Sequence, residues 1–387
     1  MDNLSAERAE VSRDDLAVPE ELSRRRLRSR LLIALAVVLV VVAGVTLLPG
    51  LSSLRSRLAD AQPGWLVLGV ALKLLSGVGY VVVFRMIFCR RMSWRVSFEV
   101  GMSELGANAL FPTGGAGGLA LGAWALKRGG MQGSEIAKRT VAFFLLTSVP
   151  NVLGVILLGL LLAAGVFAGE GNLLLTLLPA VIAAGAVVGA LMAGRVAERW
   201  GAHLRHEHRH EPSRRVEAIW KALSAFGEGV REAVALLREG NLLLVAGLAA
   251  YLVFDVLILW ATFHALGASP SLAILSLAYL IGELGGLIPV PGGIGGVDAG
   301  LVGTLALYHV PLTSAAGAVL AYRAIALWVP AVVGGGAFVA LRRTLRNEAD
   351  QLAVCAHQSE MEVIGLGRIV VRTASPEATE VSSAGGQ

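Results

Sequence analysis

Long apolar runs separated by short polar segments dominate the sequence. Several of these runs approach or exceed about 20 residues, the length that an α-helix needs to cross the hydrocarbon core of a bilayer. The pattern therefore predicts an all-α polytopic membrane protein with about six spanning helices. We place these helices at about 31–48, 64–88, 139–166, 172–194, 241–266 and 313–341.

Two further apolar regions, 96–126 and 272–308, are interrupted in the middle by proline and glycine, which break helices. Basic residues cluster beside the apolar runs, at 24–30, 90–95, 127–139, 195–238 and 342–346. The positive-inside rule places such flanks in the cytoplasm. Following the chain from a cytoplasmic N-terminus, each interrupted region must begin and end on one side of the membrane. The two regions are therefore predicted to be re-entrant hairpins that enter from opposite faces.

The two interrupted regions share a motif. One reads ELGANALFPTGGAGGL from Glu104 and the other ELGGLIPVPGGIGGV from Glu283, so both run Glu-Leu-Gly, then proline, then GGxGG. The next helices are predicted to begin alike, with RTVAFF at Arg139 and RAIALW at Arg323. Matching elements in the same order and with opposite orientation predict an inverted-topology repeat. In transporters of this architecture the broken helices mark the binding site.

The expected organisation follows from this repeat. It comprises a cytoplasmic segment at 1–30, a first membrane repeat at 31–171, a second at 172–342 and a cytoplasmic tail at 343–387. The polar stretch 195–240 within the second repeat is expected to be a cytoplasmic amphipathic loop.

Composition supports the membrane class. Hydrophobic residues make up 55% of the 387 positions and charged residues only 16%, with a mean hydropathy of +0.70. The net charge of +5 comes from the basic flanks, so it does not indicate nucleic-acid binding. Cys89 and Cys355 also lie in flanks assigned to the cytoplasm, and no disulfide is expected.

The glycine motifs are candidates for anion binding. Each would precede a half-helix, whose free N–H groups and positive dipole end favour a phosphate. The glycines and proline concerned are Gly114, Gly115, Gly117, Gly118, Pro291, Gly292, Gly293, Gly295 and Gly296.

Ionisable residues inside apolar segments cost about 2.5–3.5 kcal/mol each on insertion scales, so they are candidates for function. They are Lys73, Arg85, Glu99, Glu104, Asp255, Glu283, Asp298 and Arg323, together with Arg139 at the start of a predicted helix. A simpler reading for Arg85, Glu99 and Arg139 is that they extend to the cytoplasmic interface.

Other candidates also have two readings. Glu104 and Glu283 either bind substrate or cap and pair inside the bundle. Lys73 and Asp255 lie in corresponding helices, and either they pair with each other or Lys73 meets a lipid phosphate. Arg323 suits bidentate contact with a phosphate. Asp298 either caps its half-helix or binds ligand.

Other chemistries lack support in the sequence. The run HLRHEHRHE at 203–211 lacks metal-ligand spacing and reads as a solvated loop. The glycine motifs are not followed by GK[ST], and no Ser-His-Asp arrangement stands out. We therefore expect no metal, no cofactor and no enzymatic activity.

The segments PVPGGIGGVDAGLVG, ending at Gly303, and YRAIALWVPAVVGG, from Tyr322, resemble the lysylphosphatidylglycerol synthase transmembrane-region family, with a likeness over about 30–342. That family commonly has glutamate where this chain has Asp298. Many relatives also have an acid after the first glycine motif, which is missing here. In full synthetases a related region moves the aminoacylated lipid between leaflets, and a soluble C-terminal domain transfers the aminoacyl group. Residues 343–387 are too few for that domain.

The resemblance implies a flippase-like lipid transporter without the synthase. An anionic lipid headgroup would bind where the two breaks meet, and Glu104 and Glu283 would pair with its cationic part. The expected location is the inner (plasma) membrane with both termini cytoplasmic, and the expected partners are membrane lipids, without nucleic acid. An accessory subunit that presents a lipid to a separate glycosyl- or aminoacyl-transferase is the alternative, and a small-solute transporter also fits an inverted repeat.

Overall fold

The computed structural model describes residues 59–110, 116–164, 214–285 and 296–347, with Ser56 and parts of 180–192. Within these residues every regular element is a helix, as the sequence predicts. The helices in chain order are α4 (Pro63–Phe88), α5 (Trp94–Leu110), α6 (Ala116–Arg128), α7 (Gly133–Ala163), α9 (Arg214–Arg238), α10 (Leu242–Ala265), α11 (Leu272–Gly285), α12 (Gly296–Leu307) and α13 (Leu312–Asn347). The predicted helix at 31–48 lies outside the described residues, and most of 172–194 does too.

Four helices of the described part are long and apolar enough to cross a membrane, namely α4, α7, α10 and α13. The bounds of α4 and α10 agree closely with the predicted spans. By contrast, α7 begins at Gly133, before the predicted start at Arg139, because polar residues form its first turns. Likewise α13 continues to Asn347, past the predicted end at 341, as a basic extension. The chain is a multi-pass membrane protein.

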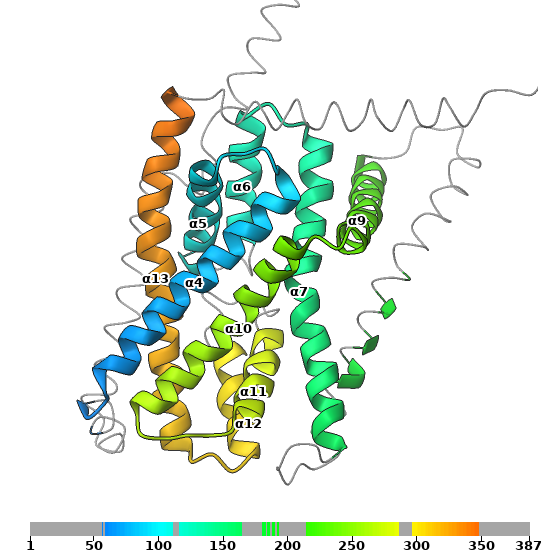
Figure 1. Ribbon diagram of the computed structural model, residues 1–387. Coiled ribbons are helices and arrows are strands. Elements are labelled where there is room, and N and C mark those ends of the chain that lie inside the picture. Colours follow the sequence, from blue (N-terminus) through cyan, green and yellow to red (C-terminus); the bar gives the residue numbers. More distant parts are fainter. Residues whose placement is uncertain are drawn as a thin grey trace, which may run out of the picture.

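Each of the two interrupted regions contains a pair of short helices that pack on each other, α5 with α6 and α11 with α12. Their helices contain 17 residues in α5, 13 in α6, 14 in α11 and 12 in α12. At about 1.5 Å per residue, each is shorter than the roughly 30 Å of a hydrocarbon core. Figure 1 shows α5 and α6 in the upper half of the bundle and α11 and α12 in the lower half. The hairpin tips at 111–115 and 286–295 lie outside the described residues.

The helices α4 and α10 form an antiparallel pair through the middle of the bundle (Figure 1). The backbone N–H of Gln62, before α4, donates to the carbonyl of Ala265 at the end of α10. Near the other end a Cβ added to Gly79 would lie 2.8 Å from the Tyr251 nitrogen and 2.9 Å from the Gly247 carbonyl oxygen. Only glycine permits this approach of two backbones, a common device in membrane helix pairs.

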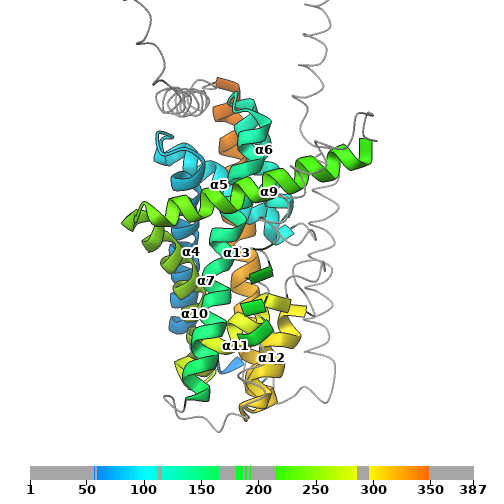
Figure 2. The same cartoon turned by 90° about the vertical axis from the view of Figure 1, so that its right-hand side faces the viewer.

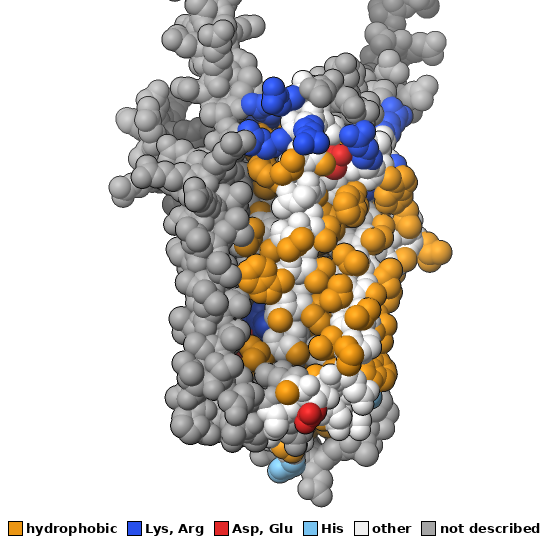
Figure 3. Space-filling model, turned by 90° about the vertical axis from the view of Figure 1, so that its left-hand side faces the viewer, with side chains coloured by type: hydrophobic (Ala, Val, Ile, Leu, Met, Phe, Trp, Pro, Cys, Tyr) orange, Lys and Arg blue, Asp and Glu red, His pale blue; other side chains and the backbone are white. Residues whose placement is uncertain are grey.

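Lys and Arg residues gather at one end of the bundle (Figure 3), and we call it the basic end. Figure 3 shows these side chains above a broad apolar band. The residues are Arg90, Arg91, Lys127, Arg128, Arg342, Arg343 and Arg346. Near this end α9 lies across the long helices (Figure 2), where Lys138 of α7 pairs with Glu232 of α9 at 3.6 Å. Both long helices α4 and α13 end at the basic end.

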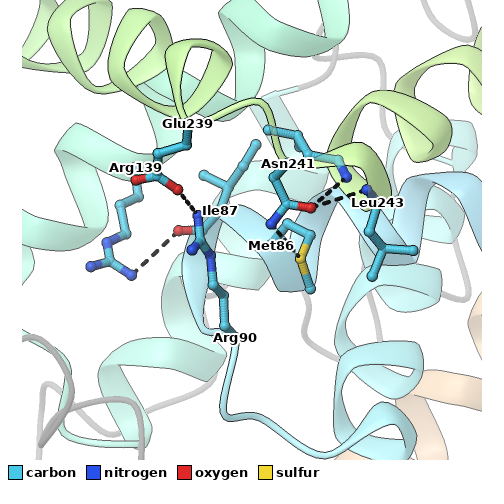
Figure 4. Close-up of polar contacts among 8 residues, drawn as sticks. Met86, Ile87, Arg90, Arg139, Glu239, Asn241 and Leu243 are labelled. Carbon is cyan, nitrogen blue, oxygen red and sulfur yellow. Dashed lines mark hydrogen bonds and ion pairs between the residues drawn. The ribbon is translucent and has the colours of Figure 1, made fainter.

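The connection from α9 to α10 is fixed to the end of α4 (Figure 4). Arg90 pairs with Glu239, which follows α9. Asn241 caps α10, accepting hydrogen bonds from the N–H groups of Leu243 at 3.0 Å and Leu244 at 3.3 Å. These contacts fix where α10 begins beside α4.

The expectation for the cysteines is wrong at Cys89, which is disulfide-bonded. Cys355 lies outside the described residues. The expectation came from the inferred compartment, and a compartment sets the redox potential in the cell without determining how far apart two sulfur atoms lie.

Candidate functional site

A buried charge pair joins α4 and α10. The Nζ of Lys73 lies 2.8 Å from Oδ1 and 3.0 Å from Oδ2 of Asp255. Both residues are buried, and the Tyr279 hydroxyl of α11 donates to the same carboxylate at 3.3 Å. Of the two readings left open by the sequence, the structure shows the mutual pair.

A second pair joins the α11–α12 hairpin to α13. The Nε of Arg323 donates to Oδ1 of Asp298 at 2.5 Å, and about a quarter to a third of each side chain is exposed. Asp298 is the third residue of α12, where its negative charge also favours the helix N-terminus. Arg323 lies well inside α13, because that helix begins at Leu312 and not at Arg323.

Glu283 of α11 lies within electrostatic range of both pairs. It interacts with Asp255, Arg323 and Lys73. We call Lys73, Asp255, Glu283, Asp298 and Arg323 the central charge cluster. The cluster contains three carboxylates and two cations, and each cation already has a carboxylate partner.

Glu104, the counterpart of Glu283 in the motif, has different surroundings. It is fully buried in α5, and its Oε2 accepts a hydrogen bond from the Tyr80 hydroxyl at 3.0 Å. Its Oε1 has no hydrogen-bond partner among the described residues. Gly122 of α6 closes over this atom, since an added Cβ would lie 1.6 Å from it. The structure therefore separates two glutamates that the sequence treats as equivalent.

The start of α6 is bound by the protein itself. The backbone N–H of Gly118, one of the groups expected to bind an anion, donates to Oδ1 of Asn108 at 2.8 Å. Gly117 lies beside it in the first turn of α6, and Gly296 is the first residue of α12. The remaining motif residues lie outside the described part of the chain: Gly114, Gly115, Pro291, Gly292, Gly293 and Gly295. An anion site at the tips stays a prediction.

Arg139 lies at the basic end and binds the end of α4 (Figure 4). Its Nη1 donates to the carbonyl oxygens of Ile87, at 3.3 Å, and of Phe88. Its Nε donates to Glu135 at 2.6 Å, and the side chain is only 4% exposed. Carbonyls at a helix C-terminus lack partners within the helix, and Arg139 supplies them.

Arg85 and Glu99 also have local partners near the basic end. The Nε of Arg85 donates to the carbonyl of Met92 at 2.8 Å, and its guanidinium lies over the Trp94 ring. Glu99 accepts from Thr344 at 2.7 Å and pairs with Arg95 at 3.1 Å. These contacts place both residues outside the central charge cluster.

Sequence reasoning missed the tyrosines and the asparagine that bind these groups. Tyr80 and Tyr279 each donate to a buried carboxylate, and Asn108 holds the start of α6. Their signal in the sequence is a hydroxyl or amide inside an apolar segment, where a polar atom needs a partner.

Among the residues that the structure describes, no three His, Cys, Asp or Glu side chains are arranged so that they could hold a metal ion together. The histidine-rich run 203–211 falls outside them.

Comparison with known proteins adds one match. Residues 31–334, which are most of the chain, match a protein family described as lysylphosphatidylglycerol synthase TM region. No curated protein matches it.

Proposed function

The chain belongs to the lysylphosphatidylglycerol synthase transmembrane-region family, and from this premise we propose that it is a flippase-like transporter of a lipid with an anionic headgroup. The observation that carries the proposal is the central charge cluster, which gathers five ionisable side chains among apolar helices. Charges at such depth are rare and mark substrate pathways. The family is membrane-associated and lipid-related, which makes a lipid headgroup the substrate that fits best.

The pairing within the cluster suggests how a headgroup binds. Lys73 is nearly enclosed, whereas the Arg323–Asp298 pair is partly exposed. A lipid phosphate would compete with Asp298 for the planar guanidinium of Arg323, which suits bidentate contact with phosphate. An amine on the headgroup would pair with Glu283, while Lys73 and Asp255 hold α4 and α10 beside the site.

Packing within the two hairpins supports an inverted repeat. Gly118 and Gly122 of α6 pack against α5, where an added Cβ at Gly118 would lie 2.5 Å from the Glu104 carbonyl oxygen. Gly296 and Gly300 of α12 stand at the same spacing after their own motif and pack against α11. Two hairpins closed in the same way from opposite ends fit alternating access by rocking of one repeat against the other.

The orientation follows from the basic end. Lysine and arginine are enriched in cytoplasmic flanks, so we assign the basic end to the cytoplasmic side of the membrane. The membrane in which we propose that the protein acts is the inner (plasma) membrane. In this orientation α5 and α6 enter from the cytoplasm, and α11 and α12 enter from outside.

A leaflet-exchange assay tests the proposal. Purified protein in liposomes is supplied with fluorescent phosphatidylglycerol, its lysyl ester or a polyprenyl phosphate. We expect protein-dependent exchange of at least one lipid, and a decrease of about tenfold in Arg323→Ala, which corresponds to about 1.4 kcal/mol. The matched variant is Arg346→Ala, an exposed arginine of the same helix, which leaves the rate unchanged. Folded protein that exchanges none of these lipids contradicts transport and favours the accessory subunit.

A further inference from the structure

The surroundings of Glu104 differ from those of the other membrane carboxylates. Lys73 pairs with Asp255, and Arg323 pairs with Asp298. Glu283 interacts electrostatically with both cations. Glu104 has one hydroxyl donor, from Tyr80, and no salt bridge among the described residues. Its carboxyl group is also wholly shielded from solvent.

The elements around Glu104 supply hydroxyl, aromatic and backbone groups. The hydroxyl of Tyr80 on α4 donates to the carboxyl group. The ring of Tyr80 packs against the rings of Tyr251 on α10 and Phe143 on α7, with centroid distances from the Tyr80 ring of 5.5 and 5.1 Å. Gly122 of α6 covers the carboxyl, and α13 packs against α5 through Gly334, close to Gly106. Tyr251 is the one further titratable group in this set.

The buried and partly buried charged residues of the same helices have other partners. On α5, Glu99 binds Thr344 and Arg95. The other described pairs are Lys73 with Asp255, Arg139 with Glu135, and Arg323 with Asp298, while Arg128 of α6 lies over the Trp124 ring. The hairpin tip 111–115 and the apolar runs 31–48 and 172–194 contain no ionisable side chain.

An ionised carboxylate enclosed in this way is strongly disfavoured, because the side chain is shielded from solvent and no cation among the described residues pairs with it. Buried groups of this kind take up a proton and become neutral. A neutral carboxyl group leaves a single polar atom unsatisfied, which is a much smaller penalty than an uncompensated charge.

We propose that Glu104 carries a proton while α6 is packed against α5, and that separation of the two helices releases it towards the basic end. Lipid translocation would then be coupled to proton movement. This inference rests on the proposed transport function and deepens it, since it assigns the α5–α6 hairpin to the proton and the central charge cluster to the headgroup.

The proton step is a simple acid dissociation. As α6 moves away, the O–H bond of Glu104 breaks and the proton passes to water that enters from the basic end. The carboxylate left behind keeps its hydrogen bond from Tyr80. Before α6 packs over it again, the carboxylate must bind one proton, because no cation in the part of the chain that the structure describes pairs with it in the closed arrangement.

Infrared spectroscopy of the purified protein in lipid tests the proton directly. We expect the carbonyl stretch of a protonated carboxyl group in the wild type at neutral pH, its loss in Glu104→Gln and its retention in Glu99→Gln. Glu99 is the matched control because it is buried in the same helix but has Arg95 and Thr344 as partners. If Glu104→Gln does not fold, Tyr80→Phe must shift the frequency of this band. A wild-type spectrum without such a band overturns the inference.

Leaflet exchange under an imposed pH gradient tests the coupling. We expect the gradient to change the wild-type rate about tenfold, and to leave the rate of Glu104→Gln unchanged. A gradient response that persists in Glu104→Gln overturns the coupling. If lipids exchange between leaflets but the infrared band is absent, Glu104 is not protonated and the transport function is still supported. The band without exchange of any lipid refutes the transport function and the coupling together.

Discussion

The ammonium group of Lys73 lies 2.8 Å from the carboxylate of Asp255, and this pair joins the two helices that pass through the middle of the bundle. Opposite charges at one depth on antiparallel helices neutralise each other where neither could stay charged alone. Tyr279 brings the α11–α12 hairpin to the same carboxylate. The pair therefore links the helix core to the hairpin that contributes Glu283 and Asp298.

Removing one member of this pair is expected to destabilise the protein strongly. Asp255→Leu leaves the ammonium of Lys73 buried without a partner, which costs about 3–5 kcal/mol. The double variant Lys73→Met, Asp255→Leu removes both charges and should recover most of this loss. Thermal unfolding in lipid nanodiscs measures both effects. A double variant as unstable as the single one would contradict a pairing role.

Alanine at Gly79 should force α4 and α10 apart. The added Cβ would lie 2.8 and 2.9 Å from backbone atoms of α10, which cannot move aside as a side chain could. We expect a loss of about 1–3 kcal/mol, seen as a lower melting temperature. Gly335→Ala is the matched control, since Gly335 lies within α13 with nothing within 4 Å of an added Cβ. Equal melting temperatures for the two variants would show that the close approach is absent.

Arg139 is expected to act on stability and not on lipid affinity. Arg139→Gln removes charged hydrogen bonds to the end of α4, each worth about 1.5–3 kcal/mol. The melting temperature should fall, while the lipid concentration at half-maximal exchange stays the same. The converse result, a normal melting temperature with weakened lipid binding, would restore Arg139 to the binding site.

The orientation can be checked by labelling of single cysteines. In a background with Cys89→Ser and Cys355→Ser, we expect an impermeant maleimide to label Ser269→Cys in intact cells. Arg343→Cys, at the basic end, should react only after the membrane is permeabilised. Both positions are exposed. The opposite pattern would place the basic end outside and reverse the assignment of the two hairpins.

Most of the helices that the structure describes could be predicted from the sequence, because the length of an apolar run and the position of a break are local properties. The bounds of α4 and α10 followed from hydropathy, and proline with glycine located both interruptions. The start of α7 was misplaced at Arg139 because a charged residue resembles a helix flank until its buried partners are known.

The candidate site was less predictable because its geometry depends on contacts between distant segments. Lys73 and Asp255 were recognised as candidates, but only the packing of α4 on α10 shows that they pair. Glu104 and Glu283 share one motif, and nothing local to it reveals that one binds Tyr80 while the other interacts electrostatically with Asp255, Arg323 and Lys73.

Photo-crosslinking shows where a lipid headgroup binds, and the site that we propose is the central charge cluster. A lipid that exchanges between leaflets is given a diazirine on its headgroup, and crosslinked peptides are identified by mass spectrometry. We predict adducts on α11 near Glu283 and on α13 near Arg323, and their loss in Arg323→Ala but not in Arg346→Ala. Adducts confined to the outer apolar surface around Val67, and unchanged by Arg323→Ala, would contradict binding of the headgroup at the central charge cluster.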